Sequence, residues 1–135
     1  MPYAVLGGIG KYTVAEGLTV TNNNPCVILT LDCFLEFMGD ITGNSYTANT
    51  VMATLPDNLA SKERVSFTVP LSYEGDSTYA DCYVDGKSLR CETSFTSKFK
   101  LKLNGANVNV CASYYTNAIG NNDNVGTSEL TETLA

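Results

Sequence analysis

The side chains of this sequence best suited to chemistry are tyrosines, amides and carboxylates. The chain has eight Tyr and no Trp. A Tyr ring can stack on the face of a sugar, and Tyr hydroxyls, Asn amides and Asp carboxylates can bond sugar hydroxyls. Tyr is also an ordinary residue of β-strands, so each Tyr taken singly has a structural explanation. The candidates for a saccharide-binding surface are Tyr73, Tyr79, Asp81, Tyr83, Tyr114, Tyr115 and Asn117.

The composition argues against an enzyme. The chain has no His, so neither a Ser-His nor a Cys-His nucleophile arrangement can form. Carboxylate pairs such as Asp32 with Glu36, or Glu74 with Asp76, could in principle cleave glycosides, but they lie in no recognisable motif. We predict a protein without catalysis or a cofactor, and a hydrolase that uses two carboxylates is the least favoured alternative.

The cysteines also argue against a metal site. Their number is odd, no pair has CxxC spacing, and no His is present to complete a ligand set. We interpret them as reduced thiols in the core of a protein made in a cytoplasm, since the N-terminus lacks the pattern of a signal peptide. The five residues are Cys26, Cys33, Cys82, Cys91 and Cys111.

The charge balance limits the partners. The net charge is −6, with 8 basic and 14 acidic residues, whereas binding to nucleic acid needs clustered Lys and Arg. The one basic cluster is Lys98, Lys100 and Lys102, which we interpret as a solvated strand face. No apolar run is long enough for a membrane span. Nucleic acid and membrane are therefore not expected partners.

Composition and turn spacing predict an all-β protein. In 135 residues, 44% are hydrophobic and 16% charged, Thr, Val and Tyr are plentiful, and helix formers are sparse. About eight to ten short strands with turns at regular intervals predict an antiparallel β-sandwich or jelly roll. We divide the chain into an N-terminal arm at 1–10, a β-sandwich domain at 11–117 and a polar C-terminal tail at 118–135.

The segment 95–114 is the strongest candidate hairpin. Asn104-Gly105 lies between two alternating runs and suits a type I′ turn, in which both central residues need φ > 0. This register pairs Leu101 with Val108 on the apolar face and places the three lysines on the opposite face.

A second hairpin is predicted at 79–92, around Asp85-Gly86. In that register Asp81 faces Arg90, and Cys82 and Cys91 are diagonal, so a disulfide between them would require adjustment. One face of this hairpin collects Ala80, Cys82, Val84, Leu89 and Cys91.

The rest of the domain reads as short strands and loops. The apolar run 26–37 alternates like one central strand, or two strands bent in the middle, with a helix as the competing interpretation. Pro70 suggests that strand 64–71 is at an edge or ends there. Further strands are expected at 11–14, 18–21 and 46–55, a loop or single helical turn at 57–63, and loops able to meet partners at 39–44 and 74–77.

Several segments in the middle and at the end of the chain resemble a module of bacteriophage tail fibres and minor virion proteins. They are ATLP at 53–56, RVSFTVP at 64–70, VDGKSL at 84–89, and the Val-rich strand that ends in SYY at 113–115. The likeness covers roughly residues 12–117. One departure is that KERV at 62–65 replaces the usual Arg-Pro before the strand.

This resemblance implies a trimeric β-sandwich exposed on a virion, where it binds cell-surface saccharide. Because the chain contains no fibre shaft, we expect a small subunit attached to a larger particle, either a capsid decoration or head-fibre protein or the tip of a tail fibre. Its expected partners are further copies in a homotrimer, other virion proteins and a host-surface polysaccharide, with the arm and tail as attachment segments. The alternative is a stand-alone carbohydrate-binding module or lectin.

Overall fold

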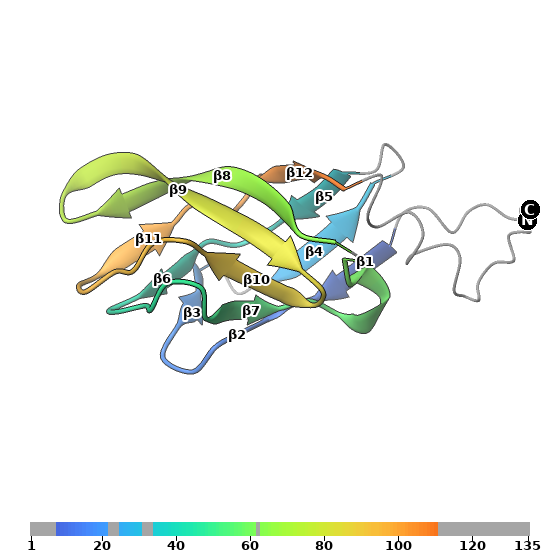
Figure 1. Ribbon diagram of the computed structural model, residues 1–135, viewed down its shortest axis with the longest axis horizontal. Helices are drawn as coiled ribbons and strands as arrows, with labels where there is room; N and C mark the ends of the chain where they lie inside the picture. The colour runs from blue at the N-terminus through green and yellow to red at the C-terminus, as the bar shows by residue number, and fades with distance from the viewer. Residues whose placement is uncertain (1–7, 22–24, 31–33, 62, 111–135) are drawn as a thin grey trace, which may run out of the picture.

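The computed structural model describes residues 8–21, 25–30, 34–61 and 63–110 (Figure 1). These residues form twelve strands and the 3₁₀ turn η2, and no α-helix occurs among them. The elements are β1 (Gly8–Lys11), β2 (Thr13–Val14), β3 (Thr19–Val20), β4 (Cys26–Leu29), β5 (Phe34–Phe37), β6 (Ile41–Gly43), β7 (Val51–Thr54), η2 (Asp57–Leu59), β8 (Val65–Tyr73), β9 (Asp76–Asp85), β10 (Ser88–Cys91), β11 (Phe99–Leu101) and β12 (Asn107–Asn109).

The strands form two antiparallel sheets, so the predicted all-β sandwich is confirmed. The small sheet has the order β1-β4-β5-β12, and the large sheet has the order β2-β7-β10-β9-β8-β11-β6-β3. The twelve described strands exceed the predicted eight to ten because several hold only two or three residues. The 3₁₀ turn η2 confirms the predicted helical turn after Pro56.

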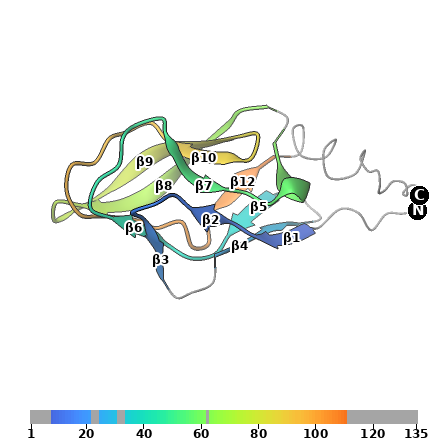
Figure 2. The same ribbon diagram turned by 90° about the horizontal axis from the view of Figure 1, so that it is seen from below.

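The large sheet curves until its two edges approach each other (Figure 2). Its edge strands β2 and β3 are consecutive in the chain, and only residues 15–18 separate them. A connection of that length spans at most about 18 Å. The sheet is therefore nearly closed, and its inner face wraps around the core.

Alternating side chains fill the space between the sheets. Val27, Leu29, Leu35 and Phe37 of the small sheet are all at most 2% exposed. The run 26–37 is two strands, β4 and β5, that pair antiparallel with Val27 opposite Phe37. The alternative of two strands is thus correct, and residues 31–33 between them lie outside the described part of the chain.

The predicted hairpin at 95–114 is wrong. β11 pairs with β6 and β8 in the large sheet, whereas β12 pairs with β5 in the small sheet. The residues around Asn104-Gly105 therefore cross from one sheet to the other. The alternation itself is correct, because Leu101, Leu103 and Val108 are all buried. Apolar residues at every second position show which side of a strand faces the core. They do not show which strand is its neighbour, because two strands on facing sheets bury their apolar sides in the same core.

The turn at Asn104-Gly105 also differs in type. The Ala106 N–H donates to the Leu103 carbonyl at 2.9 Å, and Gly105 has φ 85° while Asn104 keeps a negative φ. These features define a type II turn. The type I′ turn occurs instead at Glu74-Gly75, where φ is 53° and 81°, and it joins the long strands β8 and β9. The loop predicted at 74–77 is thus shorter than expected, because Asp76 and Ser77 already belong to β9.

The second predicted hairpin, at 79–92, is confirmed, but each residue of β10 pairs with a residue two positions further along β9 than predicted. Gly86 has φ 61° at the first central position, which is the type II′ arrangement, so Gly86-Lys87 forms the loop and Asp85 pairs with Ser88. Arg90 consequently faces Tyr83 rather than Asp81, and the predicted pair of Asp81 with Arg90 is wrong. Cys82 lies directly opposite Cys91, which corrects the predicted diagonal relation.

Two smaller predictions also require correction. The segment 39–44 is not a simple loop, because β6 lies in it and Ile41 is fully buried. Pro70 lies inside β8, which has β9 on one side and β11 on the other. The Lys102 N–H donates to the Pro70 carbonyl at 2.8 Å, but Pro has no N–H to return the bond, so the ladder with β11 ends there.

The first strand, β1, crosses the predicted boundary between the N-terminal arm at 1–10 and the domain at 11–117. β1 begins at Gly8 and pairs with β4, so the last residues of the predicted arm belong to the small sheet. Residues 1–7 and 111–135 lie outside the described part, and the division into arm, domain and tail stays a prediction. In the described ranges, no helix has the length and apolar character that crossing a bilayer requires.

Candidate functional site

Three predicted site residues lie in one row on the outside of the large sheet. Tyr79, Asp81 and Tyr83 alternate with buried residues along β9, so their side chains point away from the core. Across the ladder, Pro70 of β8 pairs with Tyr79, and Thr68 pairs with Asp81. We call this surface, made of Thr68, Pro70, Tyr79 and Asp81, the outer face.

Tyr79 is the most accessible aromatic residue of the outer face. It is 70% exposed, and its partner across the ladder is Pro70. Among the described residues its hydroxyl has no hydrogen-bond partner. An exposed ring on a regular strand provides a flat apolar surface at little entropic cost, since a Tyr side chain has only two χ angles to fix.

Asp81 lies one step along the row and is also exposed. Its carboxylate accepts a hydrogen bond from the Thr68 hydroxyl at 3.4 Å. Because the carboxylate has two oxygens and about four lone-pair positions, this single long bond leaves most of its acceptor capacity for other donors. The outer face therefore combines a ring with hydroxyl and carboxylate groups.

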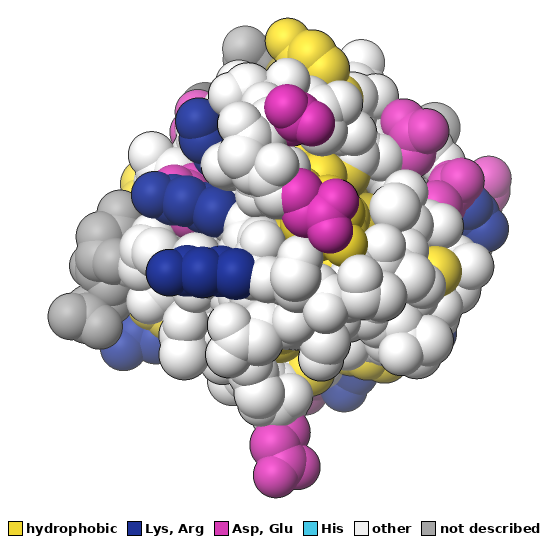
Figure 3. Space-filling model, turned by 90° about the vertical axis from the view of Figure 1, so that its left-hand side faces the viewer, with side chains coloured by type: hydrophobic (Ala, Val, Ile, Leu, Met, Phe, Trp, Pro, Cys, Tyr) yellow, Lys and Arg dark blue, Asp and Glu magenta, His cyan; other side chains and the backbone are white. Residues whose placement is uncertain are grey.

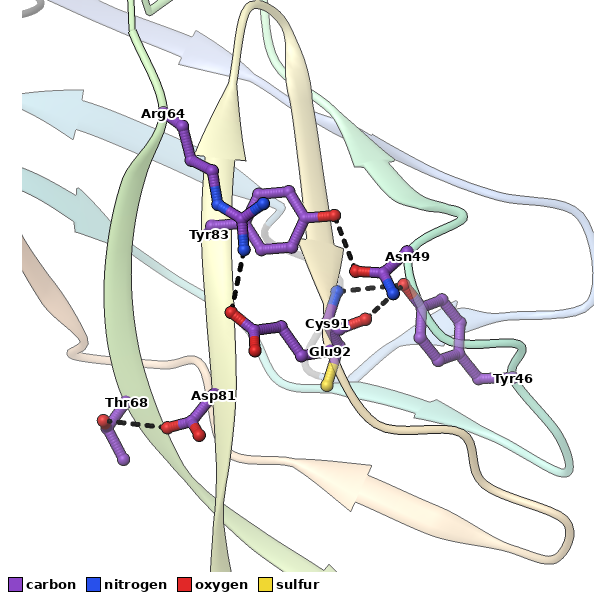
Figure 4. Close-up of polar contacts among 8 residues, drawn as sticks. All are labelled: Tyr46, Asn49, Arg64, Thr68, Asp81, Tyr83, Cys91 and Glu92. Atoms are coloured by element: carbon purple, nitrogen blue, oxygen red, sulfur yellow. Dashed lines mark hydrogen bonds and ion pairs between the residues drawn. The ribbon is translucent and has the colours of Figure 1, made fainter.

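Tyr83 has a different environment, although it shares the row. It is 5% exposed, and the Arg64 guanidinium lies 3.6 Å above its ring centroid. The Arg64 side chain also donates to Glu92 at 2.9 Å, and the Tyr83 hydroxyl donates to the Asn49 side chain at 2.8 Å (Figure 4). Both the face and the hydroxyl of Tyr83 are thus occupied by the protein itself.

These contacts give the Tyr83 cluster a structural role. Arg90 adds a hydrogen bond from its guanidinium to the Asn49 carbonyl at 2.8 Å. Nearby, the Tyr46 hydroxyl donates to the Thr50 carbonyl at 2.6 Å and accepts from the Cys91 N–H at 2.9 Å. The cluster ties the segment before β7 to β8, β9 and β10. We therefore place Tyr83 outside the binding surface.

Tyr73 is separate from the other candidates. Its ring packs against Phe95 at 5.1 Å on the inner side of the sheet, and its hydroxyl accepts from the Thr96 N–H at 3.0 Å. Hydrogen bonds from Thr96 lower the pKa of Tyr73. The structure thus does not bring Tyr73 together with Tyr79. Tyr114, Tyr115 and Asn117 lie outside the described residues.

A shallow groove of about 650 Å³ lies beside the outer face, at the end of the large sheet. Ser72 borders it and pairs with both Lys100 and Ser77, and Ser77 precedes Tyr79 by two residues on the same face. Two basic side chains lie side by side at this end of the molecule (Figure 3). The polar residues that line the groove are Thr42, Ser72, Glu74, Ser97, Lys98 and Lys100.

The groove carries charges of both signs. Lys100 lies 3.8 Å from the Asp40 carboxylate, and the Glu74 carboxylate accepts from the Ser97 hydroxyl at 3.3 Å. The lysine row was expected to be a solvated face, and its exposure agrees with that. The sequence did not reveal that Lys100 lies between two hydroxyl residues of the neighbouring strands, Thr42 of β6 and Ser72 of β8. A groove with hydroxyls, amines and carboxylates suits a ligand with many hydroxyl groups.

Of the two carboxylate pairs considered from the sequence, only Glu74 with Asp76 lies wholly within the described residues. In the described ranges, no group of three or more His, Cys, Asp or Glu residues is placed to hold a metal ion. Glu74 is the first central residue of the turn between β8 and β9, Asp76 is the first residue of β9, and both are exposed.

Comparison with protein-family models, with curated proteins and with solved structures finds no match to this chain.

Proposed function

We propose that this protein is a non-enzymatic structural subunit of a bacteriophage virion that attaches to host-surface saccharide through the outer face. The observation that supports the binding part of this proposal is the exposed Tyr79 ring. It stands on a rigid two-stranded ladder, with Asp81 and Thr68 next to it and the hydroxyl-lined groove on the other side.

The chemistry of this surface matches a sugar. The Tyr79 ring can cover the C–H face of a pyranose, while Asp81 and the hydroxyls of the groove accept and donate hydrogen bonds. Tyr79 and Asp81 each have a partner across the β8–β9 ladder, so the backbone beneath these groups is ordered before a ligand arrives. Pre-organisation of this kind lowers the entropic cost of binding.

The virion setting is supported by the resemblance described above and by where its segments lie. Residues 53–54 end β7, residues 65–70 lie in β8, and residues 84–89 join β9 to β10. In the large sheet these strands are neighbours, in the order β7-β10-β9-β8. Three of the similar segments therefore lie in neighbouring strands of the large sheet, whereas the fourth runs through β12 of the small sheet and ends outside the described residues.

A second surface could serve assembly. Ile9 is 65% exposed on β1, which is an edge strand of the small sheet. Its neighbour across the ladder is Ile28 of β4. An exposed apolar residue on an open edge is a common point of contact between copies. In our proposal this edge faces other subunits, and the outer face of the other sheet is left for saccharide.

The proposal is tested by binding to an array of immobilised bacterial-surface polysaccharides and their constituent oligosaccharides. We expect selective retention on a subset of glycans, with release by the matching free sugar. Retention on none of them, with protein shown to be folded by circular dichroism, would argue against the adhesive role. Release of reducing sugar from a retained glycan would instead support the hydrolase alternative.

A further inference from the structure

The two buried cysteines of the hairpin β9–β10 form a feature that the proposed function does not use. Cys82 of β9 and Cys91 of β10 are directly opposite each other, and both are completely buried. Because they are opposite each other and both buried, their side chains point to the same inner side of the hairpin. Both are free thiols in this structure.

The hydrogen-bond pattern of the ladder defines the geometry of this pair. The Glu92 N–H donates to the Asp81 carbonyl at 2.9 Å, so Asp81 and Glu92 are a hydrogen-bonded pair. Hydrogen-bonded and non-hydrogen-bonded pairs alternate along an antiparallel ladder, which makes Cys82 and Cys91 a non-hydrogen-bonded pair. In such pairs the Cα atoms are only about 4.5 Å apart, within the range of roughly 4.4–6.8 Å that a disulfide spans.

We propose that Cys82 and Cys91 are a site of oxidative modification that closes into a cross-strand disulfide when the protein meets a low-molecular-weight disulfide such as oxidised glutathione. The bridge would join two strands that are already paired, so the backbone need not move to accommodate it. It would cross-link the hairpin whose outer side carries Tyr79 and Asp81. This inference does not depend on the proposed function.

The reaction is a pair of thiol–disulfide exchanges. The Cys91 thiolate attacks one sulfur of oxidised glutathione, which forms a mixed disulfide and releases one glutathione thiolate. The Cys82 thiolate then attacks the Cys91 sulfur and releases the second glutathione. Each cysteine loses one proton, and the two electrons that the protein gives up reduce the glutathione disulfide to two thiols.

Cys91 is the better first nucleophile of the two. Its hydrogen bond from Cys82 lowers the pKa of Cys91, and the same bond together with burial raises the pKa of Cys82. Because both sulfurs are buried, glutathione can reach them only when the hairpin opens or before the chain has folded. The exchange should therefore be slow in native protein and fast during refolding.

The test is to refold the full chain from urea in a buffer of oxidised and reduced glutathione, and then to alkylate, digest with trypsin and map disulfides by mass spectrometry. Trypsin cleaves after Arg64, Lys87, Arg90 and Lys98, so each cysteine of the pair lies in its own peptide, 65–87 or 91–98, with no other cysteine. The other three cysteines lie in the peptides 12–62 and 103–135.

We expect peptides 65–87 and 91–98 to be joined, and the oxidised protein to melt about 5 °C or more above the reduced protein, because the bridge constrains the unfolded chain. Cys91→Ala should abolish the joined peptides, and the matched variant Cys26→Ala should retain them. Both peptides alkylated at equilibrium, or either one joined to 12–62 or 103–135 instead, would overturn the proposal. An oxidised protein that melts below the reduced protein would overturn it too.

Discussion

Single residues in this protein play different roles although their sequence contexts look alike. Tyr79 and Tyr83 stand four residues apart on the same side of β9, and the sequence gives no reason to separate them. Only the structure shows that Arg64, which precedes the neighbouring strand, covers the Tyr83 ring and leaves the Tyr79 ring exposed. Their difference arises from a residue that is distant in sequence, so no local pattern could have predicted it.

Tyr12 illustrates a residue whose hydroxyl stabilises the fold. It is 1% exposed, and its hydroxyl donates to the Met38 carbonyl at 2.7 Å. We expect Tyr12→Phe to lower the free energy of unfolding by about 1–2 kcal/mol, because a buried hydrogen bond is lost. Urea unfolding measures the change. The matched control is Tyr79→Phe, which removes an exposed hydroxyl and should change stability by less than about 0.5 kcal/mol. Equal effects of the two variants would contradict this account.

The buried tyrosines also predict how stability depends on pH. Burial raises the pKa of Tyr12, with Asp40 as a further cause, and burial likewise raises the pKa of Tyr46. In the unfolded chain both lose their proton near pH 10, whereas the folded protein keeps it. The unfolded state then binds fewer protons, so the free energy of unfolding is unaffected by these groups below about pH 9 and falls above pH 10.

Urea unfolding at a series of pH values from 8 to 11 checks this dependence. The two paired thiols contribute in opposite directions, since the pKa of Cys82 is raised and that of Cys91 is lowered. Tyr12→Phe should show a shallower alkaline decrease than the wild-type protein, because one of the titrating groups is gone. Parallel decreases for the two proteins would show that Tyr12 does not contribute.

At the scale of elements, the sequence reveals the positions of turns and the buried sides of strands better than it reveals which strands pair with each other. Alternation correctly identified the buried sides of β4, β5 and β11. It could not tell that β11 and β12 belong to different sheets, because residues on facing sheets meet the same core. The predicted turn type at Asn104-Gly105 was wrong for a related reason. Asn-Gly is the best sequence for a type I′ turn, yet the sheet crossing at Asn104 requires type II, and the type I′ turn falls on Glu74-Gly75.

These turns give a pair of opposed predictions. Glu74 has φ 53°, which costs Glu more than Asn, so Glu74→Asn should raise the free energy of unfolding by about 0.5–1 kcal/mol. Gly105 has φ 85° and no atom within 4 Å of an added Cβ, so Gly105→Ala should lower it by about 1 kcal/mol through backbone strain alone. Urea unfolding compares both with wild type. A neutral or destabilising Glu74→Asn would contradict the type I′ assignment.

At the scale of the whole molecule, the two sheets present different surfaces. The large sheet carries the polar outer face and the groove, and the small sheet ends in the open edge with Ile9. The sequence could indicate the sandwich through its composition and turn spacing. It could not assign surfaces to sheets, since that requires knowing which strands are neighbours. The outer face could therefore be identified only from the pairing of β8 with β9, which brings Thr68 and Pro70 next to Asp81 and Tyr79.

Assembly is testable by the mass of the full-length protein in solution. We expect light scattering to give the mass of a trimer, and Ile9→Lys to shift the population toward monomer, because a charge at an exposed apolar contact is costly to bury. A wild-type protein that remains monomeric at all accessible concentrations would favour the stand-alone lectin over the virion subunit.

Saccharide binding through the outer face is the central claim, and the affinity of Tyr79 variants tests it most directly. For the glycan that the array retains best, calorimetry should show that Tyr79→Ala weakens binding by roughly tenfold or more, the scale of one lost aromatic contact, while Tyr79→Phe keeps most of the affinity. Ile9→Ala, which alters the other large exposed hydrophobic residue of the described ranges, is the matched control and should bind the free glycan as wild type does. An unchanged affinity of Tyr79→Ala for that glycan would contradict the account.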